Sequence, residues 1–308
     1  MAGTFTKAYF YDEAAAFAEL ESIVWPNGPT CPKCGATDRI GSLEGVKDKK
    51  GRVRHGLRKC YACRSQFTVR IGTIFEDSHL PLHLWLQAAF LMCSSKKGVS
   101  ANQLHRTLGC TLKTAWFVGH RLREAMMPSA PGKMGGDGGV VEVDETYLGN
   151  DPDRPRKPMQ RGVGHKNQIV TLVERGGGAR SYFVPERATR DQIIAMLFEN
   201  VKGGTSIMTD ESSLYSGVGR YYPRHDTVVH TTGEYVRGDA HTNTVEGFYS
   251  IFKRGMRGVY QHCSKKHLHR YLAEFDFRYS YRVKLGYGDE ARTETMMRGI
   301  IGKRLTYR

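Results

Sequence analysis

From residue 140 to residue 253 the chain alternates short apolar runs with amphipathic segments, in the order strand, strand, strand, helix, strand, short helix, strand, helix. Three acidic residues have distinctive positions in this order of elements. Asp144 and Asp210 end the first and fourth strands, and Glu246 lies on the last helix. Strands placed side by side would bring the aspartates to one sheet edge, and a helix packed across it would bring the glutamate to them. The sequence therefore predicts an α/β domain with a mixed sheet, flanking helices and a cluster of three carboxylates.

The predicted strands lie at residues 140–143, 168–174, 179–185, 205–208 and 227–230, and the predicted helices at 188–201 and 243–253. Glu145 and Glu211 directly follow the two aspartates. Because neighbouring residues of an extended strand point to opposite faces, we expect both glutamates to face away from the carboxylate cluster unless the chain turns there.

This arrangement of acids is typical of two-metal phosphoryl transfer. Three carboxylates from distant points of a chain can hold two Mg2+ ions about 3.5–4 Å apart, one beside the attacking oxygen and one beside the leaving oxygen. Lys253 lies seven positions after Glu246 on the same predicted helix, where its ammonium group can bind a nucleic-acid phosphate.

The charge of the chain predicts a polyanionic partner. A net charge of +15 and a pI near 9.5 favour binding to a nucleic-acid backbone. From Thr244 to Arg308 there are 14 lysines and arginines against 6 acidic residues, and Arg254, next to Lys253, is a further DNA-binding candidate. Neither a long apolar run nor a secretory signal is present in the sequence, so we expect a cytoplasmic, nucleoid-associated protein without a membrane partner.

Two Cys-x-x-Cys units separated by 25 residues predict a metal site. Four thiolates in such units are typical of tetrahedral structural Zn2+. A basic turn with its tip near Gly51 lies between them, and the strand-like residues 66–71 follow. A redox dithiol is disfavoured because no thioredoxin-like strand and helix pattern adjoins the cysteines. We expect a zinc ribbon with one structural Zn2+ ion bound by Cys31, Cys34, Cys60 and Cys63.

Between residues 82 and 127 the apolar spacing becomes that of helices. Ser100 is expected to cap a short helix that ends at Gly109, and a second helix follows from Leu112 to Met126. Such a pair predicts a helix-turn-helix shape whose second helix can enter the major groove of DNA. The side chains expected to be exposed there for phosphate or base contacts are Lys113, Thr114, His120, Arg121 and Arg123.

The segment Pro128 to Gly139 is rich in Pro, Gly and Ser and predicts a linker. The expected organisation is an N-terminal helical lead-in at 1–25, a zinc ribbon at 26–75, a helix-turn-helix-like DNA-binding segment at 80–130, and a catalytic domain with basic C-terminal helices at 138–308. Core packing rather than base stacking is favoured for the aromatic residues Phe275, Phe277, Tyr279 and Tyr281.

Several motifs together resemble the Asp-Asp-Glu insertion-sequence transposases with a ribonuclease-H-like or integrase-like core, in the branch that begins with a zinc ribbon. They run over nearly the whole chain: Cys31-Pro-Lys-Cys34, Gln66-Phe-Thr-Val, Gly72-Thr-Ile-Phe75, Val143-Asp-Glu-Thr146, Thr209-Asp-Glu211 and His241-Thr-Asn-Thr-Val-Glu-Gly-Phe248. The resemblance implies cleavage of double-stranded DNA at element ends, transfer of the exposed 3′-hydroxyls to target DNA with Mg2+ or Mn2+, and a homo-oligomer in the synaptic complex.

In that family the triad would be Asp144, Asp210 and Glu246, with Lys253 as the accompanying basic residue. Some members of the branch have Asn as the third residue, and Asn243 lies three positions before Glu246 on the same helix face. Asn243 is therefore an alternative or additional ligand, or a helix cap. Glu246 is preferred because a carboxylate brings charge as well as an oxygen to a hard cation.

Two other functions remain open. A DNA-binding regulator could keep the zinc ribbon and the helix pair but lack chemistry, although the three intact acids argue against it. A ribonuclease-H-like nuclease could cleave DNA without strand transfer. Only a transposase would join pre-cut element ends to a plasmid, so this assay separates the three functions.

Overall fold

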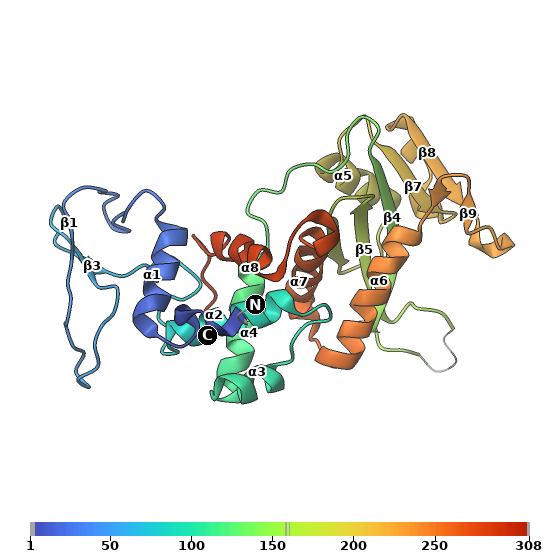
Figure 1. Cartoon of the computed structure of the whole chain (residues 1–308). Coiled ribbons are helices and arrows are strands. Elements are labelled where there is room, and N and C mark those ends of the chain that lie inside the picture. The colour runs from blue at the N-terminus through green and yellow to red at the C-terminus, as the bar shows by residue number, and fades with distance from the viewer. Residues whose placement is uncertain (1–3, 158, 160, 307–308) are drawn as a thin grey trace. The chain divides into compact units, whose positions relative to one another are not determined.

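The structure is a computed structural model that describes residues 4–157, 159 and 161–306 (Figure 1). The chain divides into two compact units. The first comprises Met1–Ser95, Val99–Met126 and Asp289–Arg308, and the second comprises Lys96–Gly98 and Met127–Gly288. One boundary therefore falls after Met126, at the start of the segment that the sequence predicts as a linker.

Residues 289–308 group with the first unit, which differs from the predicted catalytic domain of 138–308. The reason is the packing of α8 (Asp289–Arg298) against α2 (Leu82–Ser94). Met296 and Met297 of α8 are buried. Arg292 donates a hydrogen bond of 2.7 Å to the backbone carbonyl of Cys93. These long-range contacts have no signature in the basic composition of the C-terminal segment.

The other helices of the first unit are α1 (Glu13–Val24), α3 (Ala101–Leu108) and α4 (Leu112–Met126). The predicted helix pair is confirmed in its bounds and its caps. The Oγ atom of Ser100 accepts a hydrogen bond of 3.1 Å from the backbone N–H of Gln103. Gly109 ends α3 with a φ of 63°, in the left-handed region that favours glycine.

The cysteine-rich hairpin is formed by three short antiparallel strands, β1 (Ile40–Ser42), β2 (Arg58–Cys60) and β3 (Gln66–Phe67). Its long loop is closed by an isolated bridge between Lys47 and Val53, and the predicted tip at Gly51 is confirmed by a φ of 78°. The third strand is shorter than predicted because backbone hydrogen bonds from Ile71 to Thr68 and from Thr73 to Arg70 turn the chain after Phe67.

The second unit is built on a five-stranded sheet of order β6-β5-β4-β7-β8. The pairs β6–β5 and β5–β4 are antiparallel, whereas β4–β7 and β7–β8 are parallel, which is the predicted ribonuclease-H-like mixed sheet. The strands are β4 (Val140–Asn150), β5 (Lys166–Glu174), β6 (Ala179–Val184), β7 (Ser206–Asp210) and β8 (Arg224–Val228). Because β4 continues to Asn150, Asp144 lies in the middle of this strand and not at its end.

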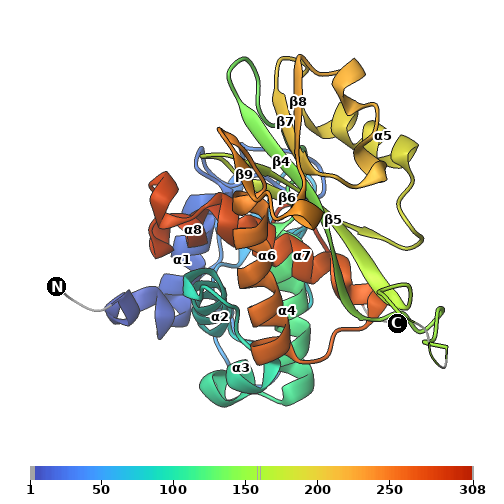
Figure 2. The same ribbon diagram turned by 90° about the vertical axis from the view of Figure 1, so that its right-hand side faces the viewer.

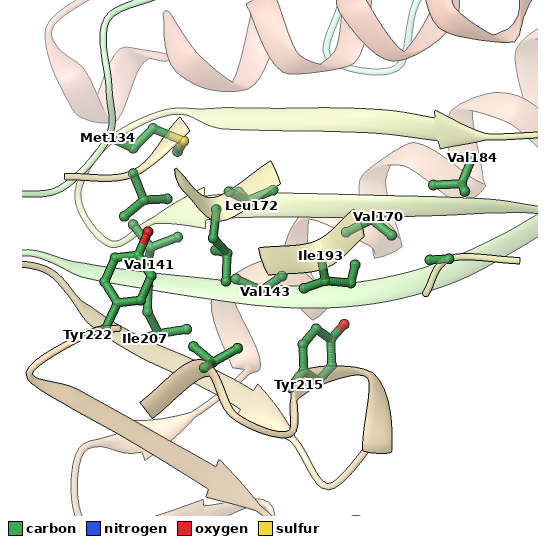
Figure 3. Close-up of a cluster of buried hydrophobic side chains, with 14 residues drawn as sticks. Met134, Val141, Val143, Val170, Leu172, Val184, Ile193, Ile207, Tyr215 and Tyr222 are labelled. Atoms are coloured by element: carbon green, nitrogen blue, oxygen red, sulfur yellow. The ribbon is translucent and has the colours of Figure 1, made fainter. Parts of the chain in front are cut away.

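Helices cover both faces of this sheet (Figure 1, Figure 2). One face packs on α5 (Arg190–Asn200) through a cluster that includes Val141, Val143 and Ile193 (Figure 3). The other face packs on α6 (Asn243–Gly255) and α7 (Leu268–Ser280). Phe275 is buried in this second cluster and Tyr279 packs against it, as the preference for core packing predicts.

A short helix is predicted between the fourth and fifth strands, and the turns Ser213–Tyr215 and Val218–Arg220 lie there, whereas the hairpin before α6 is not predicted. A small hairpin of β9 (Val236–Arg237) and β10 (Ala240–His241) directly precedes α6. Short helical turns lie at Thr4–Thr6, Ala8–Phe10, Ser213–Tyr215, Val218–Arg220, His230–Thr232, Met256–Tyr260, Lys265–His267 and Val283–Leu285. Within the described part of the chain, the helices lack the length and apolar character that a membrane crossing requires.

Candidate active site

Asp144 and Asp210 come together because β4 and β7 run parallel. The ladder pairs Val140–Glu142 of β4 with Ser206–Met208 of β7 and then stops. Continuing the same register by two residues places Asp144 beside Asp210. The two aspartates therefore lie just beyond the last paired residues of β4 and β7, in the interior of the sheet.

Helix α6 brings the third acid to the two aspartates. The hydroxyl of Tyr249 donates a hydrogen bond of 2.6 Å to the backbone carbonyl of Asp144, which fixes α6 on β4. Glu246 lies in the first turn of α6. Its Oε1 atom accepts a hydrogen bond of 3.0 Å from the hydroxyl of Thr242 and lies 3.6 Å from Nε2 of His230.

Asp144, Asp210 and Glu246 line one cavity with a volume of about 350 Å³. Its lining residues are Asp144, Glu145, Thr146, Asp210, His230, Glu246, Tyr249, Ser250 and Lys253. The structure thus brings together the three predicted acids and Lys253, which come from β4, β7 and α6. Asn243, the alternative third ligand, is exposed at the start of α6 and is not among the lining residues. Arg254 is exposed outside the cavity, and its guanidinium group donates to the hydroxyl of Ser250 at 2.8 Å.

The prediction that Glu145 faces away from the carboxylate cluster is wrong in part. Its carboxylate does point toward the α5 face, where the hydroxyl of Tyr215 donates to it at 2.5 Å. However, the β4–β7 ladder has already ended at this level, so Glu145 still lines the cavity. Glu211 follows the prediction: its carboxylate accepts hydrogen bonds from the backbone N–H groups of His230 and Thr231, at 2.9 and 3.1 Å.

Negative charge is concentrated in the cavity without an equal positive partner. Burial raises the pKa of Asp144 to about 8, and the neighbouring carboxylates of Asp210, Glu145 and Glu246 add to the shift. Burial also raises the pKa of Asp210, although a hydrogen bond of 3.0 Å from the N–H of Ser212 opposes it. Burial lowers the pKa of Lys253, while the charge of Asp144 raises it. A bound cation would relieve this repulsion, so the donor set fits a hard divalent metal ion.

His230 was not identified as a site residue from the sequence. It lies two residues after Val228, which registers with Asp210 across the parallel pair β7–β8. That position at the end of the neighbouring strand is the signal that could have indicated it. The Nδ1 atom of His230 is buried and has no hydrogen-bond partner among the residues that the structure describes.

The four predicted zinc ligands also converge. The Sγ atoms of Cys31, Cys34, Cys60 and Cys63 all lie within 4.8 Å of one another. Hydrogen bonds from the side chain and the backbone of Ser65 lower the pKa of the Cys63 thiol to about 6, which favours a thiolate ligand. Within the part of the chain that the structure describes, these four thiols form a group that could hold a metal ion.

The predicted DNA-binding face of α4 is only partly exposed. Lys113 is exposed at the first turn, where the N–H of Thr114 donates to the hydroxyl of Thr111 at 3.1 Å. In contrast, Arg121 and Arg123 are each 4% exposed and His120 is fully buried, so the prediction that they face DNA is wrong.

Arg121 has a structural role instead. Its guanidinium group donates hydrogen bonds to the backbone carbonyls of Ile74 and Glu76, both at 2.7 Å, and to that of Leu305 at 3.2 Å. Arg123 is packed beside Gly119, where an added Cβ atom would lie 3.2 Å from the Nη1 atom of Arg123. A charged residue on an amphipathic helix is usually solvated, and here backbone carbonyls replace the water around Arg121.

Comparison with known proteins supports both parts of this description. Residues 137–280 match the family model described as the ISXO2-like transposase domain, and residues 11–66 match the transposase zinc-ribbon domain. These ranges include the three acids, Lys253 and the four clustered cysteines. A protein of Halobacterium salinarum described as an uncharacterised protein in transposable element ISH50 is 30% identical over 287 residues, which is 87% of this chain and 91% of the relative.

A solved structure, the mariner Mos1 paired end complex with Mg, aligns with 70% of this chain and 75% of its own at 13% identity and a TM-score of 0.27. A score this low supports no conclusion about the function of the chain.

Proposed function

The chain belongs to the ISXO2-like transposases, and from this premise we propose that it cleaves the ends of an insertion sequence and joins the resulting 3′-hydroxyls to target DNA. The observation that carries the proposal is the single cavity lined by Asp144, Asp210, Glu246 and Lys253. A regulator without chemistry would have no need for these acids in one cavity. A nuclease without strand transfer remains the second candidate, because it would use the same cavity.

Asp144, Asp210 and Glu246 would hold two Mg2+ or Mn2+ ions. Glu246 is favoured over Asn243 as the third ligand because Glu246 lines the cavity and Asn243 does not. The ions would activate the attacking oxygen and stabilise the leaving oxygen. Asp144, whose pKa burial raises to about 8, would bind a cation in its deprotonated form, because a nearby positive charge lowers that pKa.

The other residues of the cavity would bind and orient DNA. The ammonium group of Lys253, which lies 5.7 Å from the ring centre of Tyr249, would bind a phosphate oxygen beside the scissile bond. In cleavage, water adds to phosphorus and the bond to the 3′ oxygen breaks, leaving a 3′-hydroxyl after protonation. In joining, that hydroxyl loses its proton, forms a new bond to a target phosphorus, and displaces the target 3′ oxygen.

The remaining parts of the chain would recognise the element end. One structural Zn2+ ion would be held by the four clustered cysteines and would keep the basic hairpin folded. Lys113 and Thr114 at the start of α4 would contact the duplex, and Lys253 and Arg254 would contact phosphates near the cut. A homo-oligomer would hold two element ends in one synaptic complex.

The test is strand joining with a supercoiled plasmid and pre-cut DNA duplexes that carry the ends flanking the gene. Asp144→Asn and Asp210→Asn each remove one charge without changing the side-chain volume, so joining and cleavage should be lost while DNA binding persists. Glu199→Gln is the matched control, because Glu199 is exposed on α5 outside the cavity. Retained joining by either aspartate variant overturns the assignment. Cleavage without joining by the unmodified protein indicates the nuclease.

A further inference from the structure

We propose that Glu142 is a positioning residue whose carboxylate fixes the start of α6 to β4 and thereby sets Glu246 relative to Asp144 and Asp210. This inference rests on the proposed function, because it concerns the same metal-binding cavity. Glu142 does not line the cavity and is fully buried. Its position in the apolar run of β4 gives no indication of this role.

The carboxylate of Glu142 is hydrogen-bonded on both oxygens. Its Oε2 atom accepts from the backbone N–H groups of Thr244 and Val245, at 2.7 and 3.0 Å. Its Oε1 atom accepts from the hydroxyl of Thr244 at 2.7 Å and from Nε of Arg175 at 2.6 Å. The Nδ1 atom of His241 also lies 3.1 Å from Oε1, without the geometry of a hydrogen bond. Donors thus face both oxygens.

These bonds replace the cap that α6 lacks. The first N–H groups of a helix have no partner within the helix, and a residue just before it usually supplies one. Thr242, at the N-cap position of α6, makes no side-chain cap hydrogen bond and instead donates its hydroxyl to Glu246. Glu142 caps α6 from a neighbouring strand, and its negative charge also suits the positive end of the helix dipole.

Arg175 extends the same anchor to the hairpin in front of α6. Besides its bond to Glu142, its Nη1 atom donates to the backbone carbonyl of Asp239 at 2.7 Å, and its Nη2 atom donates to that of His241 at 2.9 Å. The ion pair of Glu142 and Arg175 therefore holds both β10 and the first turn of α6 against β4.

The location of this anchor makes its consequence specific. Glu142 lies two residues before Asp144, on the same face of β4, and Glu246 lies in the helical turn that Glu142 caps. Farther along α6, the hydroxyl of Tyr249 independently holds the backbone of Asp144. Loss of the cap should therefore loosen the first turn and displace Glu246, while the rest of α6 stays in place.

The experiment measures Mn2+ affinity of the full-length, zinc-loaded protein without DNA, by electron paramagnetic resonance. Glu142→Gln replaces one carboxylate oxygen with an NH2 group. In either orientation of the amide this NH2 group faces a hydrogen-bond donor, so the cap is weakened at nearly constant side-chain volume. Affinity should fall about 10–100-fold, the usual effect of losing a residue that orients metal ligands. Thr244→Val keeps the backbone bonds but removes the hydroxyl, so it should lower affinity by a smaller factor. Joining by Glu142→Gln should recover at higher Mn2+ concentrations.

Asp276→Asn is the matched control. Asp276 of α7 also binds a backbone N–H and a hydroxyl, both from Ser181 of β6 at 2.7 and 2.6 Å, but it holds no residue of the cavity. Its variant should keep the full Mn2+ affinity even if it loses stability. An equal loss in this control would show that instability alone explains the effect, and would overturn the inference.

Two further outcomes are decisive. Unchanged Mn2+ affinity in a folded Glu142→Gln, together with the expected loss in Asp144→Asn, overturns the role of Glu142 and leaves the proposed function intact. Unchanged affinity in Asp144→Asn as well overturns both, since no metal site would then lie in the cavity. If Glu142→Gln does not fold, Thr244→Val decides the question, and unchanged affinity in that variant overturns the inference.

Discussion

The hydroxyl of Tyr249 lies 2.6 Å from the backbone carbonyl oxygen of Asp144 and donates a hydrogen bond to it. This bond joins α6 to β4 at the residue whose carboxylate enters the cavity. The ring of the same tyrosine lies 5.7 Å from the Nζ atom of Lys253. Tyr249 therefore contacts both Asp144 and Lys253, which are more than a hundred positions apart in the sequence.

Tyr249→Phe should lower the free energy of unfolding by about 1–3 kcal/mol, because the carbonyl of Asp144 loses a buried donor. The rate of strand joining should also fall, since the backbone that carries Asp144 is less well fixed. Urea unfolding and joining kinetics at saturating DNA measure the two effects. Tyr221→Phe is the control, as the ring of Tyr221 is 49% exposed. Equal joining rates for the two variants would contradict this role of Tyr249.

The elements around the cavity could be predicted because each depends on a local pattern. The strands carry apolar runs, α5 and α6 have amphipathic spacing, and the acids lie at recognisable points of that order. The cross-connections could not be predicted in the same way. Glu142 is an acidic residue within an apolar run, and the local sequence does not indicate what it binds. Its partners Thr244 and Arg175 lie far away in the sequence. Their contact exists only after the sheet and α6 have packed together.

The same limit explains the error on α4. Helical periodicity identifies its bounds correctly, but the rule that arginines are exposed fails where folded backbone offers carbonyl acceptors. The acceptors of Arg121 come from residues 74, 76 and 305, which no local pattern associates with α4. Similarly, Glu145 lines the cavity because the β4–β7 ladder ends early, and the length of a ladder depends on both strands.

Asp144 should make the stability of the magnesium-free protein depend on pH. In the folded protein burial raises the pKa of Asp144 to about 8, from its ordinary value of 3.8 in the unfolded chain. Between these values the folded state holds a proton that the unfolded state has lost, so the free energy of unfolding falls as the pH rises through this window. Asp144→Asn, which is neutral throughout, should show a smaller fall. Thermal unfolding from pH 5 to pH 8 measures it, and parallel curves for both proteins would refute the assignment of the shift.

The third metal ligand is tested by comparing Glu246→Gln with Asn243→Ala. Glu246 lines the cavity and contacts Thr242, whereas Asn243 is not among the lining residues. The loss of joining should therefore be more severe in Glu246→Gln, and a modest increase in Mg2+ should not restore it, because a charged ligand is missing. Joining rates are compared at equal thermal stability. A larger loss in Asn243→Ala would transfer the role to Asn243.

The full-length protein should contain one equivalent of zinc, and Cys60→Ser should lose it. A tetrahedral site left with three ligands is much weaker, and folding of such a hairpin is coupled to the metal. Elemental analysis measures the zinc, and limited proteolysis should show cleavage within residues 26–75 while the second unit resists. Cys263→Ser is the control, since Cys263 lies outside the cluster. Zinc retained by Cys60→Ser would count against the site.

Lys113 and Arg121 lie on the same helix, but substitution of Arg121 should lower protein stability whereas substitution of Lys113 should lower DNA binding. Arg121→Ala leaves three backbone carbonyls without their donor, so it should destabilise the first unit by about 3 kcal/mol or more. Lys113→Ala removes an exposed charge and should change stability by less than about 0.5 kcal/mol.

If Lys113 contacts a phosphate, its variant should bind all duplexes more weakly, with a reduced salt dependence. If it contacts a base, preference for the element end should fall by about 1–3 kcal/mol. Unfolding midpoints and DNA affinities at several salt concentrations measure both variants. Normal stability of Arg121→Ala, combined with a loss of sequence preference, would instead place Arg121 on DNA.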